Sequence, residues 1–141
     1  MLNILRRFIL LAIVLAVSGC AVIQPKTDEE RVFALAEQRQ AALLERDFVA
    51  AYKYMSPGYR QLNTLEQFTS NYTGVYAWES SDVLSAACEE DICKVHVEIE
   101  YDSARMFNTG RRPSVEKQII SRVNIETWLK LDNRWWFSKS Q

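Results

Sequence analysis

The chain has 141 residues, of which 48% are hydrophobic and 25% charged, values typical of one ordinary globular domain. Its 17 basic and 18 acidic residues leave a formal net charge of −1, whereas nucleic-acid-binding domains usually carry a clear basic excess. The composition therefore argues against a nucleic-acid partner.

The first residues are typical of a secretory signal peptide. Arg6 and Arg7 precede an apolar run over residues 8–17, and the small residues Ser18 and Gly19 follow it. A helix of that length spans about 15 Å, roughly half of a bilayer core, which is short for a transmembrane helix. A short membrane-anchoring helix that is never cleaved is the alternative interpretation.

The sequence VSGC at positions 17–20 resembles the lipobox of bacterial lipoproteins, which has a branched apolar residue, two small residues and an essential cysteine. The resemblance implies that residues 1–19 are a lipoprotein signal peptide, cleaved between Gly19 and Cys20. It also implies that Cys20 carries a diacylglyceryl group and often an acyl chain such as palmitate on its amine. Two or more chains anchor a protein stably in a membrane. Residues 20–27 then form a lipidated tether.

The residue after that cysteine predicts which membrane holds the anchor. In the lipoprotein family, an aspartate at this position favours retention in the inner membrane of Gram-negative cells. This chain has Ala21 instead. We therefore expect a cell-envelope protein, lipid-anchored through Cys20 to the outer membrane and facing the periplasm.

Three helices are predicted after the tether. The residues TDEE from Thr27 form a capping box that starts a helix over 28–46, where apolar residues recur at helical spacing. A second helix is predicted over 48–55 and ends at the Ser-Pro-Gly break at 56–58. A further capping box, TLEQ, predicts a third short helix within 64–72.

The remaining two cysteines, Cys88 and Cys93, flank an acidic loop. An even number of cysteines suits an oxidising compartment. The chain has one histidine, too few ligands for a zinc site, and the spacing differs from the Cys-x-x-Cys of redox proteins. A cross-strand disulfide in an antiparallel hairpin is the preferred interpretation, and two free thiols are the alternative.

This hairpin predicts a register that places Asp82 opposite Ile99, on the apolar face of the second strand. On that strand Cys93, Val95, Val97, Ile99 and Tyr101 alternate with Lys94, His96, Glu98 and Glu100. Asp82 is thus a weak candidate for a catalytic carboxylate, unless it lies where the strand frays. His96 falls on the polar face, where a solvated structural role is expected.

Residues 114–137 predict a long strand, a type I′ turn at Asp132 and Asn133, and a closing strand. Trp128 shares the polar register with Glu126, so we expect it on the outer face of the sheet as a candidate interaction surface. A β-bulge near Thr127 would instead turn it inward.

The long loop over residues 102–114 is the other candidate interaction surface. It is basic because it carries three arginines, Arg105, Arg111 and Arg112. These side chains could contact lipid head groups or an acidic partner. A simply solvated loop is the alternative.

Helices followed by antiparallel strands predict an α+β domain with the helices on one face of a sheet. The opening helix, the stretch LLERDFVAAYKYMSPGYRQLNTLEQF and the final WLKLDNRWWF resemble the nuclear-transport-factor-two-like (cystatin-like) superfamily. The resemblance covers residues 28–139. It implies a curved sheet that wraps helices into a cone, as one domain over 28–141.

The resemblance leaves two functions open. Members of that superfamily include isomerases and dehydratases that use a buried Asp or His inside the cone. The sequence shows no such constellation, no phosphate-binding loop and no metal-ligand spacing, so we predict no cofactor and no metal. We expect a non-enzymatic lipoprotein that binds a partner protein or a small apolar ligand. A pocket enzyme of the isomerase or dehydratase type is the alternative, and a structural role in an envelope assembly is a third hypothesis.

Overall fold

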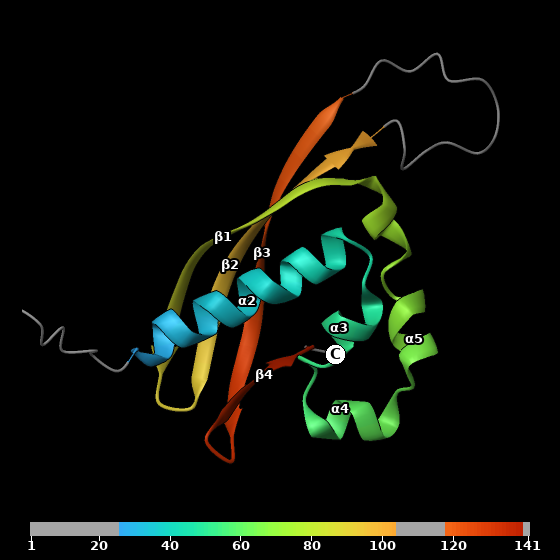
Figure 1. The fold of residues 1–141 in the computed structure, drawn as a ribbon. Coiled ribbons are helices and arrows are strands. Elements are labelled where there is room, and N and C mark those ends of the chain that lie inside the picture. The colour runs from blue at the N-terminus through green and yellow to red at the C-terminus, as the bar shows by residue number, and fades with distance from the viewer. Residues whose placement is uncertain (1–25, 104–117, 140–141) are drawn as a thin grey trace, which may run out of the picture.

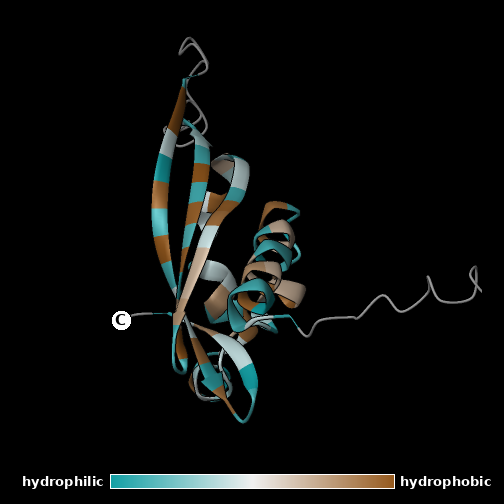
Figure 2. Ribbon diagram, turned by 90° about the vertical axis from the view of Figure 1, so that its left-hand side faces the viewer, coloured by the Kyte–Doolittle hydropathy of each residue, from teal (hydrophilic) through white to brown (hydrophobic). Residues whose placement is uncertain are grey.

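The fold is α+β, with helices preceding a four-stranded antiparallel sheet, as predicted (Figure 1). The computed structural model describes residues 26–103 and 118–139. In chain order the elements are α2 (Asp28–Leu44), α3 (Phe48–Tyr52), α4 (Pro57–Leu62), α5 (Leu65–Ser70), a 3₁₀ helix (Thr73–Ala77), β1 (Trp78–Glu89), β2 (Ile92–Asp102), β3 (Ile119–Leu131) and β4 (Arg134–Ser138). The strands lie in the order β1-β2-β3-β4. Figure 2 shows the helices on one face of the sheet, and no described helix covers the other face.

Side-chain caps explain where the helices begin. Thr27 and Thr64 form the predicted capping boxes of α2 and α5. The sequence pattern did not predict α4, where the Ser56 hydroxyl accepts a hydrogen bond from the backbone N–H of Tyr59 at 3.2 Å and Pro57 lies in the first turn. Proline is compatible with that position because its missing N–H has no partner within the helix there. The Ser-Pro-Gly segment therefore starts a helix and does not end one, because α3 already ends at Tyr52, before the predicted end at residue 55.

The β1–β2 hairpin contains the predicted cysteine pair but only part of the predicted register. Cys88 lies opposite Cys93, with Cα atoms 4.0 Å apart, and the two form a disulfide. A register shift at Leu84 then moves the pairing by one residue, so that Asp82 lies opposite Glu98. A one-residue shift reverses the face of every side chain beyond it. Asp82 is therefore exposed, and its predicted place on the apolar face is wrong.

The inner and outer faces of β3 are the reverse of the predicted ones. Trp128 lies opposite Cys93 and is fully buried, while Glu126 lies opposite Val95 and is 9% exposed. The β2–β3 pairing has no register shift, so no bulge turns the indole inward. Ile125 faces outward instead and is 63% exposed. Trp128 is a core residue, and the prediction that it forms an interaction surface is wrong.

The core lies between α2 and the inner face of the sheet. Its fully buried side chains include Val32, Ala36, Leu43, Met55, Phe68, Val95, Val97 and Trp128. The β3–β4 hairpin turns at Asp132 and Asn133, whose φ angles of 50° and 59° confirm the type I′ geometry. A backbone bridge between Met55 and Phe137 joins the end of the α3 region to β4. This joint fixes the hairpin beside α2.

Candidate functional site

The first candidate site is a cluster of polar side chains buried between α2 and the sheet. Arg39 Nη1 donates to Glu126 Oε1 at 2.5 Å, and Gln40 Nε2 donates to the same oxygen at 2.7 Å. Trp128 Nε1 donates to the other carboxylate oxygen, Oε2, at 3.1 Å. These side chains belong to a group of six that we call the inner polar cluster: Arg39, Gln40, Tyr72, Ser81, Glu126 and Trp128.

Tyr72 and Ser81 complete this cluster. Arg39 Nη2 donates to the Tyr72 hydroxyl at 2.5 Å, and Ser81 Oγ donates to Gln40 Oε1 at 2.8 Å. The Arg39 guanidinium also lies over the Phe137 ring, 3.7 Å from its centroid. Burial raises the pKa of Tyr72, so its phenol stays neutral at neutral pH. The guanidinium is thus held by a carboxylate, a phenol and an aromatic face.

The Glu126 carboxylate is poorly placed to act as a general base. A base needs a free lone pair within hydrogen-bond reach of the substrate. Both Glu126 oxygens already accept hydrogen bonds, and Arg39 compensates the charge. A pocket of about 200 Å³ borders the cluster, and its lining includes Arg39, Tyr72 and Glu126. The arrangement favours a structural role for the charge pair over catalysis.

Of the predicted site residues that the structure describes, Cys88 and Cys93 form the predicted disulfide, whereas Asp82 and Trp128 do not share a site. Asp82 is exposed on β1, and Trp128 is buried in the inner polar cluster. The remaining predicted site residues lie outside the described residues: Gly19, Cys20, Arg105, Arg111 and Arg112. Within residues 26–103 and 118–139, no group of His, Cys, Asp and Glu side chains could hold a metal ion. In the same part of the chain, no helix is long and apolar enough to cross a membrane.

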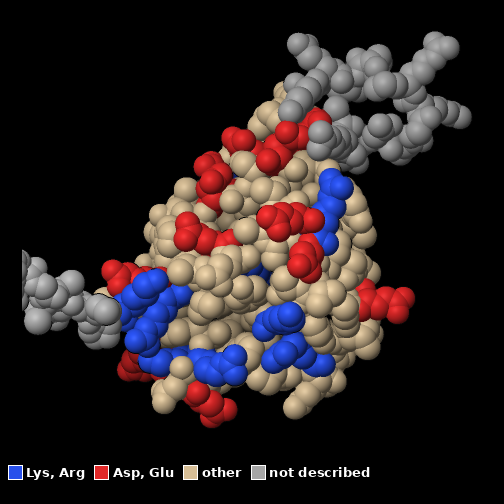
Figure 3. Space-filling model, in the orientation of Figure 1, with Lys and Arg blue, Asp and Glu red and all other residues tan. Residues whose placement is uncertain are grey.

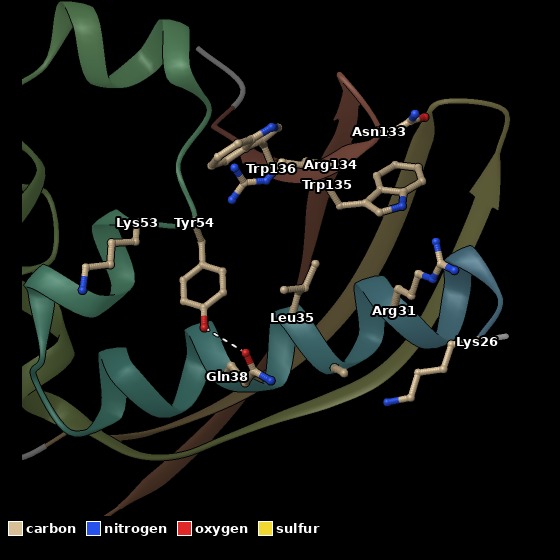
Figure 4. Close-up of a pocket in the computed structure, with 11 residues that line it drawn as sticks. Lys26, Arg31, Leu35, Gln38, Lys53, Tyr54, Asn133, Arg134, Trp135 and Trp136 are labelled. Atoms are coloured by element: carbon tan, nitrogen blue, oxygen red, sulfur yellow. Dashed lines mark hydrogen bonds between the residues drawn. The ribbon is translucent and has the colours of Figure 1, made fainter. Parts of the chain in front are cut away.

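The second candidate site is an open groove of about 590 Å³ between one face of α2 and the β3–β4 hairpin (Figure 4). We call it the basic groove, and it is lined by Lys26, Arg31, Ala34, Leu35, Gln38, Lys53, Tyr54, Asn133, Arg134, Trp135 and Trp136. The α2 residues share one face because neighbours on a helix recur every three to four positions. The Tyr54 hydroxyl donates to Gln38 Oε1 at 3.0 Å and ties the segment after α3 to α2.

In the part of the chain that the structure describes, four cations and no carboxylate line the basic groove. Among the described residues, Lys26, Lys53 and Arg134 make no ion pair, and Arg31 makes only a 3.8 Å contact with Asp28. Figure 3 shows lysines and arginines gathered over the lower part of the molecule, with acidic residues over the upper part and at the lower rim. The groove is therefore a local basic surface on a chain whose net charge is −1.

Asp28 stabilises one wall of the groove without lining it. Lys130 Nζ lies 2.9 Å from Asp28 Oδ2, and Trp135 Nε1 donates to Oδ1 at 3.2 Å. These hydrogen bonds, with that of Lys130 the stronger, hold the pKa of Asp28 below its ordinary value of 3.8. The carboxylate thus compensates Lys130 and fixes the Trp135 ring at the groove wall.

Comparisons with known proteins inform the fold only. No protein-family profile matches the sequence, and no curated protein does. The chain is similar to the solution structure of a SEC-C motif-containing protein from Rhodopseudomonas palustris, with a TM-score of 0.53 and 19% identity over 75% of this chain and 73% of that chain.

Two further solved structures have TM-scores of 0.46. One is described as an NTF2-like transpeptidase from Campylobacter jejuni, 14% identical over 74% of this chain and 94% of that chain. The other is described as a calcium/calmodulin-dependent protein kinase II association domain from Xanthomonas campestris, 12% identical over 82% of this chain and 92% of that chain.

Sequence reasoning missed Arg39 and Glu126, although Arg39 left a signal. Arg39 continues the buried face of α2 that begins at Val32 and Ala36. A charged residue in an apolar helical register predicts a buried partner on the facing element. The basic groove left no local signal, because its cations come from three separate segments of the chain.

Proposed function

We propose that this protein is a lipid-anchored, non-enzymatic binding protein of the cell envelope, with a nuclear-transport-factor-two-like fold and its ligand in the basic groove. The supporting observation is the open groove itself, with four cations, no lining carboxylate and three aromatic side chains. Cations without ion-pair partners are available to a ligand, whereas the charges of the inner polar cluster are already paired. The order of helices and strands supports the proposed fold.

The composition of the groove refines the class of ligand. The expected small apolar ligand would leave the groove cations without a counter-charge. An anion that also carries an apolar or planar part would contact both the cations and the rings of Tyr54, Trp135 and Trp136. We therefore propose an amphipathic anion as the ligand.

The alternative of a pocket enzyme has lost its named carboxylate, because Asp82 is exposed. A carboxylate that does lie inside the domain, Glu126, is held on both oxygens. Glu126→Gln would keep the shape of the side chain while removing its charge. An isomerase or dehydratase activity in the native protein that this variant abolishes, while its circular dichroism spectrum stays that of the parent, would favour the enzyme over the binding protein.

The lipid anchor is tested by mass spectrometry of protein extracted from membranes of a bacterial host. We expect an N-terminal peptide that begins at Cys20 and carries diacylglycerol. The variant Cys20→Ser should accumulate as an uncleaved precursor. An unmodified Cys20 in the native protein, or normal processing of the variant, would contradict the anchor without bearing on the groove.

The ligand site is tested with two fluorescent probes of similar shape, anionic 1-anilinonaphthalene-8-sulfonate and neutral N-phenyl-1-naphthylamine. We expect saturable binding of the anionic probe and weaker binding of the neutral one. Lys53→Gln with Arg134→Gln should weaken binding of the anion. Lys94→Gln with Arg122→Gln changes the net charge equally outside the groove and should leave it unchanged. Equal effects of the two pairs would overturn the ligand site.

A further inference from the structure

We infer that the basic groove binds the phosphate of an anionic lipid head group at the membrane surface. This inference rests on the proposed function and names the ligand class of the same site. It also assigns a second, non-covalent contact between the domain and the bilayer, in addition to the proposed anchor at Cys20. Three features of the structure carry it: the placement of the cations, the depth of the aromatic rings and the position of Lys26.

The cations approach the groove from more than one side. Arg31 belongs to α2, Arg134 begins β4, and Lys53 follows α3 (Figure 4). These cations therefore lie on both long walls and at one end of the groove. Arginine presents several N–H donors to phosphate oxygens, and lysine adds a mobile point charge. A phosphate fits this set better than a neutral ligand does.

The aromatic rings form walls and do not protrude. Trp135 is 8% exposed and Trp136 is 9% exposed. The guanidinium groups of Arg134 and Arg60 lie over the Trp136 ring, at 4.7 Å and 5.2 Å from its centroid. Tryptophan, tyrosine and basic residues are enriched at the head-group level of membranes. Rings this deeply seated can contact the glycerol part of one lipid, but they cannot insert into the bilayer.

The sequence keeps one rim of the groove close to the proposed anchor. Lys26 lines the groove and follows Cys20 by six positions. A fully extended segment of that length spans at most about 22 Å. Basic residues interact with an anionic membrane surface only within about a Debye length, which is about 8 Å at physiological ionic strength. A lipid-anchored Cys20 therefore allows the groove to approach the head groups to within that distance.

The acidic residues around the groove restrict the contact to single head groups. Acidic side chains lie over the upper part of the groove-bearing face and at its lower rim (Figure 3). The tip of the β1–β2 hairpin adds Glu89 and Glu90, both exposed. A flat anionic surface pressed against this whole face would be repelled by them. No carboxylate stands among the described residues that line the groove, so a phosphate that enters it avoids this repulsion.

The experiment uses a soluble chain of residues 20–141 with Cys20→Ser, so that binding cannot come from acylation. Every described helix, strand and core residue lies between Asp28 and Ser138, which this chain retains. Sedimentation with phosphatidylglycerol vesicles at about 0.1 M salt should show binding, and phosphatidylcholine vesicles should show little. Lys53→Gln with Arg134→Gln should weaken binding about 25-fold, because each cation near an anionic membrane contributes about fivefold.

The control pair, Lys94→Gln with Arg122→Gln, should bind the vesicles nearly as well as the parent chain. Glycerol phosphate should compete with the vesicles for the groove, which would support head-group recognition. Absence of vesicle binding by the parent chain, or an equal loss in both variant pairs, overturns the inference. Binding of inorganic phosphate without binding of vesicles would assign the groove to a free anion. That result also overturns the inference that the phosphate belongs to a lipid head group. If the anionic dye still binds in the groove, the proposed function survives each of these failures.

Discussion

The inner polar cluster and the basic groove lie on two faces of the same helix, α2. The charges of the cluster are buried and paired, whereas those of the groove are open to solvent. On one face, α2 buries Arg39 against Glu126, with hydrogen bonds to every oxygen of the carboxylate. On the other, α2 contributes Arg31 to an open groove in which Lys53 and Arg134 make no ion pair with a described residue. The number of charges in a region therefore does not show what the region does. Whether the charges reach solvent and whether they are paired decides that.

The physical reason is the cost of desolvation. Moving a charge out of water costs several kcal/mol in real proteins, and only a close partner with good geometry offsets that cost. Removing one member of the buried pair should therefore affect the whole fold. Removing a groove cation should affect only what the groove binds. The following variants test this contrast.

The largest effect is expected from Glu126→Leu. This substitution leaves the Arg39 guanidinium buried without its carboxylate, and it also removes the acceptor for Gln40 and Trp128. Loss of one partner of a buried charge pair typically costs about 3–5 kcal/mol of the free energy of unfolding. Urea denaturation followed by far-ultraviolet circular dichroism measures it.

The double variant Arg39→Met with Glu126→Leu is the matched control. It removes both charges, so no uncompensated ion remains in the core. We expect it to be more stable than the Glu126→Leu single variant, because an apolar pair of similar size often replaces a buried ion pair with little loss. The losses of unfolding free energy in Glu126→Leu alone and in Arg39→Met alone provide the comparison. If their sum equals the loss in the double variant, the two charges are not coupled and the contrast with the groove fails.

A smaller effect is expected when the disulfide is removed by Cys88→Ala with Cys93→Ala. Cys93 lies opposite Trp128 on the inner face of the sheet, so the disulfide lies beside the inner polar cluster and not at the basic groove. Cross-linking so short a loop contributes about 2 kcal/mol in the chain-entropy model. We expect a lower urea midpoint and unchanged binding in the groove. Two titratable thiols in the unreduced, denatured parent protein would contradict this prediction.

The sequence predicted the positions of helices and strands better than it predicted which face of each strand is buried. Local signals such as the capping boxes at Thr27 and Thr64 depend on neighbouring residues, and the structure confirms both. Trp128 shows the limit of such signals. Alternation along β3 separates two faces, but only packing against α2 decides which face is buried. The partner of Glu126 lies on α2, far away in sequence, so the polar face was assigned to solvent.

The register of β1 shows a second limit. Pairing outward from Cys88 and Cys93 is correct as far as Ala86 and fails at Leu84, where one extra residue enters the strand. A bulge of this kind has no strong sequence signature. Its consequence is large, since it moves Asp82 from the predicted inner face to solvent. The predicted catalytic candidate is therefore not inside the domain, although the antiparallel pairing of the two strands was correctly predicted.

Asp28 links the two regions, because it joins the start of α2 to the hairpin that walls the groove. Its lowered pKa means that the carboxylate stabilises the fold above its ordinary pKa of 3.8, and this contribution is lost as the pH falls through the lower value of the folded state. We expect Asp28→Asn to be less stable than the parent at neutral pH. The difference should vanish in strong acid, where both side chains are uncharged. Urea midpoints at several pH values measure it, and a constant difference would indicate that hydrogen bonds, not charge, carry the effect.

The smallest effect on stability is expected from Lys53→Gln with Arg134→Gln. Both side chains are exposed, and neither makes an ion pair with a described residue, so their removal leaves no buried group without a partner. Surface substitutions of this kind change the free energy of unfolding by no more than about 0.5 kcal/mol. The same double variant should lose binding of the anionic probe. A loss of stability as large as that of Glu126→Leu would show that the groove cations hold the fold together, and the contrast between the two faces of α2 would no longer stand.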